Sequence, residues 1–479
     1  MVVTTDPLDL AVLLAYVGGV VAFGASYARR SRGTREFTAA GGRLGGWAVG
    51  LSIFATFLSS NTFLGVPGRA FASNWNAFVF SLSLPPAAWI AARWFVPFYR
   101  RHGHISAYHH LEARFGPWAR TYGLACYLLT QLARMGSVLF GVALVTTALT
   151  GWSMAATILA VGVLVTLYTL VGGIEAVIWT DVVQSFVLVG GALAVLWAIL
   201  GGTPGGVERV LADAGQAGKL DLGSFAADFS TSTFWVVLLY GLFINLNNFG
   251  IDQSYVQRYH TSRTTPEARR SVWLAAALYL PVSLLFFFLG SAMWVFYSAQ
   301  PELAADLVAA VGAGSPDGAA GTGGAGAPAG TTAAALDGLS HPKVGDRALP
   351  HFIATQLPPG VTGLLVAAML AAAMSSLDTS LNSSATVLLT DVYTTYIRPG
   401  ADERESMRFL RGATFAMGAI GIATALAMMG VESLLDAWWT LSGIFAGGLL
   451  GLFLLGMIAR RADRPSAVAG VVAGVTVIL

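Results

Sequence analysis

The stretch Ala55-Thr-Phe-Leu-Ser-Ser-Asn-Thr62 places four consecutive polar residues in the middle of an apolar segment, 46–72, that is long enough to cross a membrane. Gly65, Pro67 and Gly68 follow in the same segment. Small residues pack neighbouring membrane helices together, which explains the glycines but not Ser-Ser-Asn-Thr. Because unwound backbone at membrane depth is tolerated only where it lines a cavity, we expect this helix to be broken there.

A second apolar segment, 233–258, is interrupted in the same way by Asn245-Leu-Asn-Asn-Phe-Gly250. The two interrupted segments are the first helices of two predicted five-helix blocks, 46–201 and 233–459. Since five is odd, the second block must lie inverted in the membrane relative to the first. A pair of interrupted helices at corresponding places in two halves predicts the binding site of a transporter.

Composition sets the class of protein. The 479 residues are 55% hydrophobic and only 11% charged, with a mean hydropathy of +0.67. Soluble domains carry about 25% charged residues, so the chain is predicted to be an all-α polytopic membrane protein. The single cysteine, Cys126, excludes a disulfide framework and multi-cysteine metal sites. So few charges give no support for a nucleic-acid partner, and no Ser/His/Asp constellation indicates an enzyme.

The apolar stretches predict the individual membrane helices. They cover residues 8–29, 46–72, 75–99, 117–149, 153–172, 176–201, 233–258, 271–298, 361–395, 408–430 and 433–459. A further helix begins near Pro465 and is cut short at Leu479, so we expect the chain as given to end inside a membrane segment. Asp6 and Asp9 lie at the start of the first apolar segment and basic residues follow it, the reverse of a secretory signal. We therefore expect that helix to be retained.

Arginines divide the loops into two sets. With the N-terminus placed outside, 21 of the 25 arginines fall on the inner side, Arg120 and Arg258 among them. Only Arg69, Arg209, Arg347 and the two lysines fall outside. Basic residues in short loops stay cytoplasmic, and scarce lysine is typical of a GC-rich bacterial genome. The sequence thus predicts a multi-pass protein of a bacterial inner membrane with its N-terminus outside.

These signals predict a division of the chain into five parts. They are an N-terminal peripheral helix with a basic inner loop over 1–45, the first five-helix repeat over 46–201, an outer loop over 202–232, the second five-helix repeat over 233–459, and the start of a truncated C-terminal helix over 460–479. Within the second repeat, 299–349 is expected to be a flexible outer loop, because Gly312–Ala335 is nearly all Gly, Ala, Thr and Pro.

A third polar cluster lies within segment 361–395. Hydroxyls at Ser375, Ser376 and Thr379 and a carboxylate at Asp378 line one side of a helix near its middle. Hard monovalent cations need several oxygen ligands, and hydroxyls with freed backbone carbonyls supply them. A carboxylate inside the membrane indicates function by default, which singles out Asp378 and also Asp181.

Four stretches together resemble the sodium:solute symporter family. They are Tyr168-Thr-Leu-Val-Gly-Gly-Ile-Glu-Ala-Val-Ile-Trp-Thr-Asp-Val-Val-Gln184, Ala371–Asp391 with Tyr393 beyond it, Asn245 to Arg258-Tyr, and Tyr108-His-His-Leu-Glu-Ala-Arg-Phe-Gly116. The resemblance extends over essentially the whole chain in order. It implies a LeuT-type 5+5 inverted repeat with one extra N-terminal helix, and sodium-coupled uptake by alternating access.

The resemblance also implies ion sites. The main sodium site would use the backbone oxygens of Ala55, Leu58 and Ala372 and the hydroxyls of Ser375 and Ser376. Some members bind a second sodium ion, which here would contact Asp181, Ser375, Asp378 and Thr379. Asp378 departs from the pattern, because two-sodium members have serine at this position. Its carboxylate is expected to strengthen sodium binding, to hold a proton, or only to pair with neighbouring hydroxyls.

The substrate is expected between the two broken helices. The predicted contacts are Ser59, Ser60, Thr62, Phe78, Ser81, Arg134, Asn245, Asn248 and Phe249. The planar fork of Arg134 suits a carboxylate, and bacterial sialic-acid symporters of the family place a substrate-binding arginine at this position. Sugar transporters have a tyrosine where Asn248 stands. A carboxylate such as sialic acid is therefore favoured, unless Arg134 snorkels to the membrane surface or pairs internally with an acidic residue.

Other functions remain open at this point. One is the symporter-like sensor region of a histidine kinase whose C-terminal part is missing. Another is proton-coupled transport of a sugar, amino acid or vitamin through Asp181 or Asp378. A channel is disfavoured, because the polar residues cluster at mid-depth. The expected partners are a small organic solute, one or two sodium ions and the lipid bilayer, and the chain is expected to function as a monomer.

Overall fold

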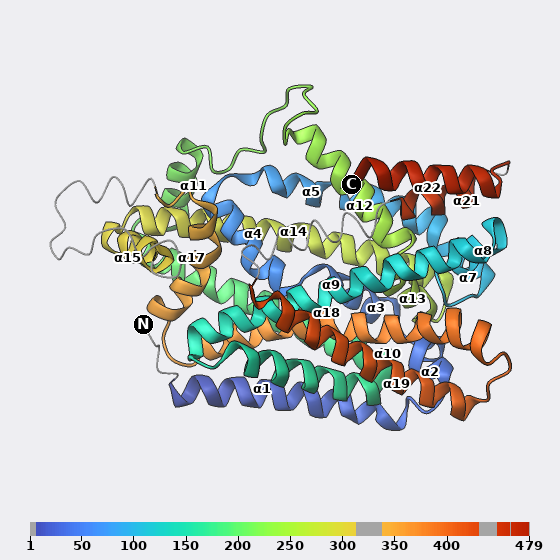
Figure 1. The fold of residues 1–479 in the computed structure, drawn as a ribbon. Coiled ribbons are helices and arrows are strands. Elements are labelled where there is room, and N and C mark those ends of the chain that lie inside the picture. The colour runs from blue at the N-terminus through green and yellow to red at the C-terminus, as the bar shows by residue number, and fades with distance from the viewer. Residues whose placement is uncertain (1–5, 313–337, 431–447, 460, 479) are drawn as a thin grey trace.

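The computed structural model describes residues 6–312, 338–430, 448–459 and 461–478. These residues are helices and connecting loops, with one isolated backbone bridge between Leu44 and Ser262. Within these residues, seven helices are long and apolar enough to cross a membrane, and two bent helix pairs pass the same test (Figure 1). The prediction of an all-α polytopic fold is confirmed.

Six long helices run side by side through the protein (Figure 1). They are α1 (Pro7–Ser26), α9 (Pro117–Thr150), α10 (Met154–Gly202), α14 (Thr265–Ser298), α18 (Val361–Val387) and α19 (Glu403–Ala427). Helix α18 is buried along nearly its whole length and packs against α1, α9, α10 and α19. The polar cluster on this helix therefore lies in the centre of the molecule.

The first interrupted segment forms two helices, α3 (Gly46–Phe57) and α4 (Ser60–Ala72). Between them Leu58 and Ser59 are extended, and the two helices are bent by 53° relative to each other. The predicted break is confirmed at the predicted residues.

The second interrupted segment forms α12 (Phe234–Gly250) and α13 (Gln253–Thr261), bent by 50°. The predicted break of this segment is confirmed, but it lies at Ile251 and Asp252, directly after the stretch Asn245–Gly250 where it was expected. Asn245 stays helical, and its side chain binds the hydroxyl of Ser83. Asp252 stops the helix instead, because its carboxylate accepts the backbone N–H of Ser254 and so caps α13.

The label α10 covers two helices that meet at a kink at Gly173, so the predicted division into helices 153–172 and 176–201 is confirmed. The φ of Gly173, +62°, is one that side chains disfavour. A Cβ at Gly173 would also lie 2.9 Å from the Cα of Phe37. Glycine therefore permits both the bend and the close approach.

The predicted helix 75–99 is a single span, Trp75–His102, built from short pieces. These are η3 (Trp75–Phe78), α5 (Val79–Leu82), α6 (Leu84–Ile90), the π-helical turn η4 (Ala91–Phe95) and α7 (Val96–His102). Helix α18 likewise continues as a π-helix, η6 (Leu388–Ile397). The remaining predicted helix, 433–459, lies partly outside the described residues, and its last part is α21 (Leu449–Ile458).

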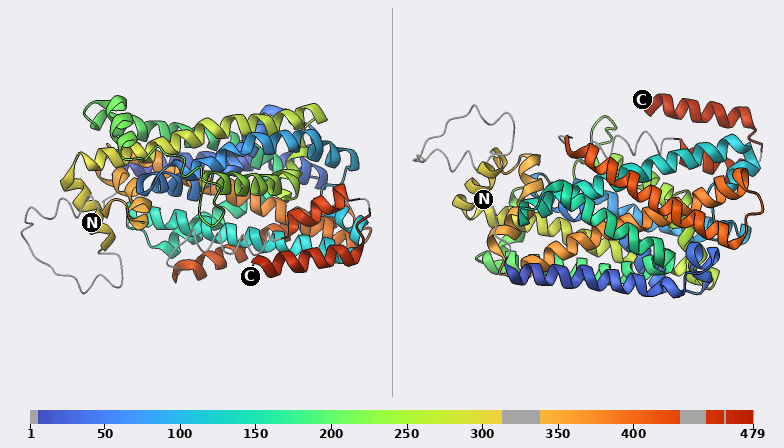
Figure 2. Two further views of the ribbon diagram at one scale, coloured as in Figure 1. Left: turned by 90° about the horizontal axis from the view of Figure 1, so that it is seen from above. Right: turned by 60° about the horizontal axis from the view of Figure 1, so that its bottom comes forward.

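Several short helices were not predicted. They are α2 (Thr34–Ala39), α8 (His109–Phe115), α11 (Gly206–Gln216), α15 (Pro301–Gly312) and α17 (Pro342–Gln356). The expectation of a flexible loop over 299–349 is thus wrong at both ends, while residues 313–337 of its Gly/Ala-rich run lie outside the described chain. Helix α17 forms because His341 caps it and its apolar side chains pack on α4. The C-terminal helix α22 (Arg464–Ile478) lies on the outside of the bundle (Figure 2).

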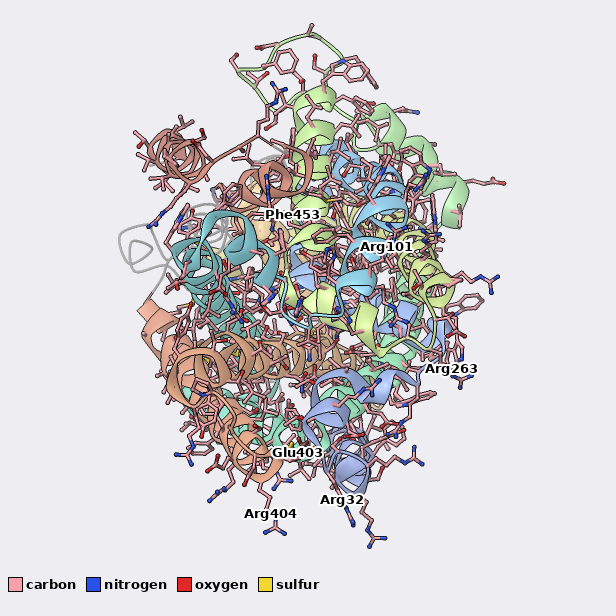
Figure 3. The ribbon with its side chains drawn as sticks, turned by 90° about the vertical axis from the view of Figure 1, so that its right-hand side faces the viewer. Arg32, Arg101, Arg263, Glu403, Arg404 and Phe453 are labelled. Carbon is pink, nitrogen blue, oxygen red and sulfur yellow. The ribbon has the colours of Figure 1, made fainter. Side chains whose placement is uncertain are left out.

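The two ends of the bundle differ in composition. Helices α11, α15 and α17 gather at the end where α1 begins (Figure 1). Arg32, Arg101, Arg263 and Arg404 lie at the opposite end, here called the arginine-rich end (Figure 3). The segments predicted to lie outside and inside are therefore separated by the length of the bundle.

The predicted outer loop 202–232 is anchored to the bundle by Lys219. Its ammonium donates to the carbonyl oxygens of Phe71, at 2.7 Å, and Ala72, at 3.2 Å, at the end of α4. Burial lowers the pKa of Lys219 to about 8. A cation at the C-terminal end of a helix stabilises it, so this contact fixes the outer end of α4.

Close packing of α4 on α17 predicts an asymmetry between two glycines of α4. A Cβ at Gly68 would lie 2.8 Å from the carbonyl oxygen of Gly345, whereas a Cβ at Gly65 would meet nothing within 4 Å. We expect Gly68→Ala to lower the free energy of unfolding by about 1–3 kcal/mol and to lower the thermal midpoint in detergent. The matched control, Gly65→Ala, should leave the midpoint unchanged; equal effects would contradict the packing described here.

Candidate functional site

The break between α3 and α4 frees backbone groups deep in the protein. The N–H of Leu58 binds the carbonyl of Ala55 at 3.0 Å instead of continuing the α-helical pattern. Across the break, the hydroxyl of Ser59 accepts the N–H of Thr62, and the hydroxyl of Thr62 accepts the N–H of Ser59. These two predicted substrate residues therefore also cap α4. The side chain of Ser60 lies outside the described part of the structure.

A buried arginine lies next to this break. Arg258, on α13, has a side chain that is 1% exposed, and its Nη2 lies 3.0 Å from Oδ2 of Asp181 on α10. It also donates to the hydroxyls of Ser52 and Thr379 and to the carbonyl of Ser254, each at 2.7 Å. Its assignment to the inner-loop arginines is therefore wrong, because α13 carries it into the interior.

The carboxylate of Asp181 joins four helices at one point. Its Oδ1 accepts the hydroxyl of Ser375 on α18 at 2.5 Å. Its Oδ2 accepts the hydroxyl of Ser52 on α3, also at 2.5 Å, as well as the guanidinium of Arg258 on α13. Burying an unpaired charge costs several kcal/mol, so this set of contacts holds α3, α10, α13 and α18 in one arrangement.

The residues of α18 that are predicted to bind sodium lie on adjacent turns beside the Asp181–Arg258 ion pair. Ser376 donates to the carbonyl of Ala372 at 3.2 Å, while Ser375 is bound to Asp181. Helix α18 packs against both α3, which ends next to Leu58, and α4. The structure thus brings the two broken halves to the helix that carries the predicted hydroxyl ligands.

Asp378 has a different set of partners from Asp181. Its Oδ2 accepts the hydroxyls of Tyr168, at 2.7 Å, and Thr180, at 3.3 Å. Its Oδ1 is buried and has no hydrogen-bond partner among the described residues. The residues predicted to form a second sodium site are therefore divided: Ser375 and Thr379 belong to the Asp181–Arg258 network, and Asp378 does not.

An aromatic cluster packs against the break in α3. Phe57 contacts the rings of Phe249, Tyr255 and Tyr279 at centroid distances of 5.6, 5.0 and 5.4 Å. Arg134 lies on α9 and is half-buried. Helix α9 packs on both α4 and α18. The structure therefore places Phe249, a predicted substrate contact, in the aromatic cluster at the break, and Arg134 on a helix that packs against α4 and α18.

The other predicted substrate contacts lie on η3, α5 and α12. Phe78 packs on Phe287 of α14 with a centroid distance of 5.5 Å, and Ser81 shares a hydrogen bond of 2.7 Å with Ser283. Asn245 is fully buried, and its Oδ1 has no partner among the described residues, whereas Asn248 is half-buried. The hydrogen bond of Ser81 thus joins α5 to α14, and the hydrogen bond of Asn245 joins α12 to the turn before α6.

Sequence reasoning missed Arg258 and Ser52 as parts of the site. The available signal was local: Ser254 and Arg258 are four residues apart, directly after a broken helix, in a stretch with few apolar residues. A second buried pair was also missed. Arg120, counted with the inner loops, lies on α9 and binds Asp391, at 2.6 Å, and Glu112.

The buried network predicts a charge-dependent stability effect. In sodium-free buffer, Asp181→Asn leaves Arg258 buried and unpaired, so we expect the free energy of unfolding to fall by about 3–5 kcal/mol. Adding Arg258→Met to this variant should restore most of the loss, because it removes the unpaired charge. Thermal denaturation in detergent measures both effects.

A matched control is the exposed pair Arg209–Asp213 on α11. Asp213→Asn should change stability by less than about 1 kcal/mol. If Asp181→Asn were equally mild, or if Arg258→Met gave no recovery, the network would not hold the helices together.

Comparisons with known proteins agree with this arrangement. A model of the sodium:solute symporter family matches residues 37–474. The sodium/sialic acid symporter NanT of Aliivibrio fischeri is 32% identical over 98% of this chain and 87% of its own length. The sodium/sialic acid symporter SiaT of Proteus mirabilis is 29% identical over 98% of this chain and 89% of its own length.

Solved structures show the same relationship. A substrate-bound, outward-open Na+-coupled sialic acid symporter has a TM-score of 0.86 at 28% identity, covering 98% of this chain and 91% of that one. Mhp1, a nucleobase-cation-symport-1 transporter, has a TM-score of 0.52 at 14% identity, which shows a shared fold alone. The family match and these relatives establish that this chain belongs to the sodium:solute symporter family.

Proposed function

We propose that this protein imports a sialic acid, or a closely similar organic carboxylate, together with Na+ across a bacterial plasma membrane. The observation that carries the proposal is Arg134, a half-buried arginine within the membrane-spanning helix α9, which packs against α4 and α18. A guanidinium there matches a carboxylate in charge and in geometry. The similarity to two sodium/sialic acid symporters supports the same substrate class.

The main sodium site would consist of the backbone oxygens of Ala55, Leu58 and Ala372 and the hydroxyls of Ser375 and Ser376. The break supports this proposal, because it leaves carbonyl groups at Ala55 and Leu58 without regular α-helical partners. A sodium ion at this point would tie α3 to α18. Because Ser59, which caps α4, directly follows Leu58, filling the ion site would also order the substrate side of the break.

A second cation would bind near Asp181, Ser375, Asp378 and Thr379. The charge balance supports it: two buried carboxylates, Asp181 and Asp378, face one buried guanidinium, that of Arg258. The unpartnered Oδ1 of Asp378 favours a cation or a proton at that atom. Proton coupling is therefore the second candidate mechanism. Measuring how uptake depends on the sodium concentration at fixed pH distinguishes sodium coupling from proton coupling.

We further propose that the chain is an inverted repeat with α3/α4 and α12/α13 as equivalent broken helices. The repeats would extend over 46–201 and 233–459, as a monomer in the bilayer. The arginine-rich end would face the cytoplasm. The N-terminus would then lie outside, because α1 begins at the other end (Figure 1).

Removing the hydroxyl ligands tests the sodium site. Each lost ligand is worth about 1 kcal/mol, so Ser375→Ala with Ser376→Ala should raise the half-saturating Na+ concentration for uptake by roughly tenfold or more. Ser271→Ala is the control, since that buried hydroxyl of α14 binds only the carbonyl of Ala268. Unchanged sodium dependence in the double variant, or uptake driven by a pH gradient without sodium, would contradict the site.

Removing the guanidinium tests the substrate class. In the presence of Na+, N-acetylneuraminic acid should raise the thermal midpoint of the wild type. Arg134→Ala should weaken its binding by roughly thirtyfold or more, because a charged contact to the carboxylate is lost, while the shift caused by Na+ alone is retained. Arg411→Ala, an exposed arginine on α19, is the control. Tight binding by Arg134→Ala would exclude a carboxylate at this position.

A further inference from the structure

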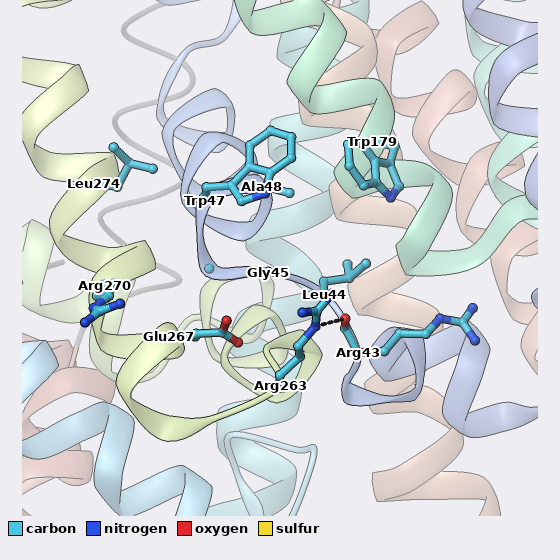
Figure 4. A pocket seen from close by; sticks show the side chains of 11 residues that line it. Arg43, Leu44, Gly45, Trp47, Ala48, Trp179, Arg263, Glu267, Arg270 and Leu274 are labelled. Carbon is cyan, nitrogen blue, oxygen red and sulfur yellow. Dashed lines mark hydrogen bonds between the residues drawn. The ribbon is translucent and has the colours of Figure 1, made fainter.

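A pocket of about 610 Å³ lies at the arginine-rich end, far along the bundle from α11, α15 and α17 (Figures 1 and 4). It lies between the start of α3, the middle of α10 and the start of α14. Its lining is Arg43, Leu44, Gly45, Gly46, Trp47, Ala48, Trp179, Arg263, Glu267, Arg270 and Leu274. None of these residues belongs to the proposed sodium or substrate contacts.

The charges of the pocket favour an anion. Three guanidinium groups line it, against the single carboxylate of Glu267. Arg43 is paired with Glu175 outside the lining, and Arg263 uses its Nε for the carbonyl of Arg43 at 2.8 Å (Figure 4). Arg270 makes no hydrogen bond or ion pair within the described part of the chain. The Nη groups of Arg263 and the whole guanidinium of Arg270 are therefore available to a ligand.

The opposite wall of the pocket is apolar. Trp47 is 54% exposed and makes an edge-to-face contact with Trp179, with a centroid distance of 5.5 Å (Figure 4). Leu274 of α14 continues this wall. Tryptophan is enriched where a membrane meets water, and basic pockets between membrane helices bind lipid headgroups. A soluble anion would contact only the arginines. A phospholipid would contact the arginines with its headgroup and the apolar wall with an acyl chain.

The floor of the pocket is built from backbone. The N–H of Leu44 binds the carbonyl of Thr261 at 3.0 Å, and the N–H of Arg263 binds the carbonyl of Leu44 at 3.1 Å. A Cβ at Gly46 would lie 2.6 Å from the carbonyl oxygen of Glu267. The arginines are thus held on a rigid base, and the pocket joins the beginning of α3 to the link between α13 and α14.

We infer that this pocket binds the headgroup of an anionic phospholipid, with the phosphate at the guanidinium groups of Arg263 and Arg270, which lie on either side of Glu267 (Figure 4), and an acyl chain along Trp47 and Leu274. The bound lipid bridges α3 and α14. The lipid therefore contacts the start of α3, which belongs to the first broken pair, and also α14, which follows the second broken pair, α12/α13.

Lipid binding can be measured directly by native mass spectrometry of the full chain in a neutral detergent, titrated with phosphatidylglycerol or phosphatidylcholine. We expect phosphatidylglycerol to bind the wild type at least roughly tenfold more tightly than phosphatidylcholine. Arg263→Gln with Arg270→Gln should remove this preference. The control is Arg101→Gln with Arg404→Gln, two arginines at the same end but outside the pocket (Figure 3); it should keep the preference.

A second variant separates a lipid from a soluble anion. Trp47→Ala should weaken phosphatidylglycerol binding, and glycerol 1-phosphate should fail to displace the lipid from the wild type. An unchanged lipid preference in the arginine double variant would overturn the site. Displacement by glycerol 1-phosphate would overturn the choice of lipid and indicate a soluble anion. These measurements need neither sodium nor transport, so their outcome is independent of the proposed sodium-coupled uptake.

Discussion

The ion pair between Arg258 and Asp181 is the contact on which the interior arrangement depends. Both side chains are removed from water, and their hydrogen bonds reach α3 through Ser52 and α18 through Ser375 and Thr379. In a medium of low dielectric constant, separating such a pair is costly. Any movement of the broken helices relative to α10 and α18 therefore has to exchange these partners or move with them.

The breaks in the helices follow from the same constraint. A transmembrane helix has no water with which to satisfy freed backbone groups, so each break is closed by side chains: Ser59 and Thr62 cap α4, and Asp252 caps α13. The proposed ion site would use the carbonyl oxygens near Leu58 at the first break. Because the proposed ion and substrate sites share this break, ordering one side of it would order the other.

Much of this arrangement was predictable from the sequence. The four polar residues before Phe63 identified the first break, because a run of polar side chains at membrane depth is costly unless it lines a cavity or caps an opened backbone. The second break was misplaced, since Asn245 looks like a disrupting residue until Ser83 is seen to satisfy it. Arg258 was assigned to a loop because hydropathy does not report that an arginine will meet a carboxylate 77 positions away in the chain.

The sequence by itself determined the all-α membrane fold, the two interrupted helices and the separation of arginines to one end. These properties depend on hydropathy and backbone hydrogen bonding, which act over a single helix or loop. Only the tertiary structure decided that Asp181 pairs with Arg258 while Asp378 binds Tyr168 and Thr180. Both carboxylates look alike in the sequence, because the partner of a buried charge is chosen by how distant helices pack.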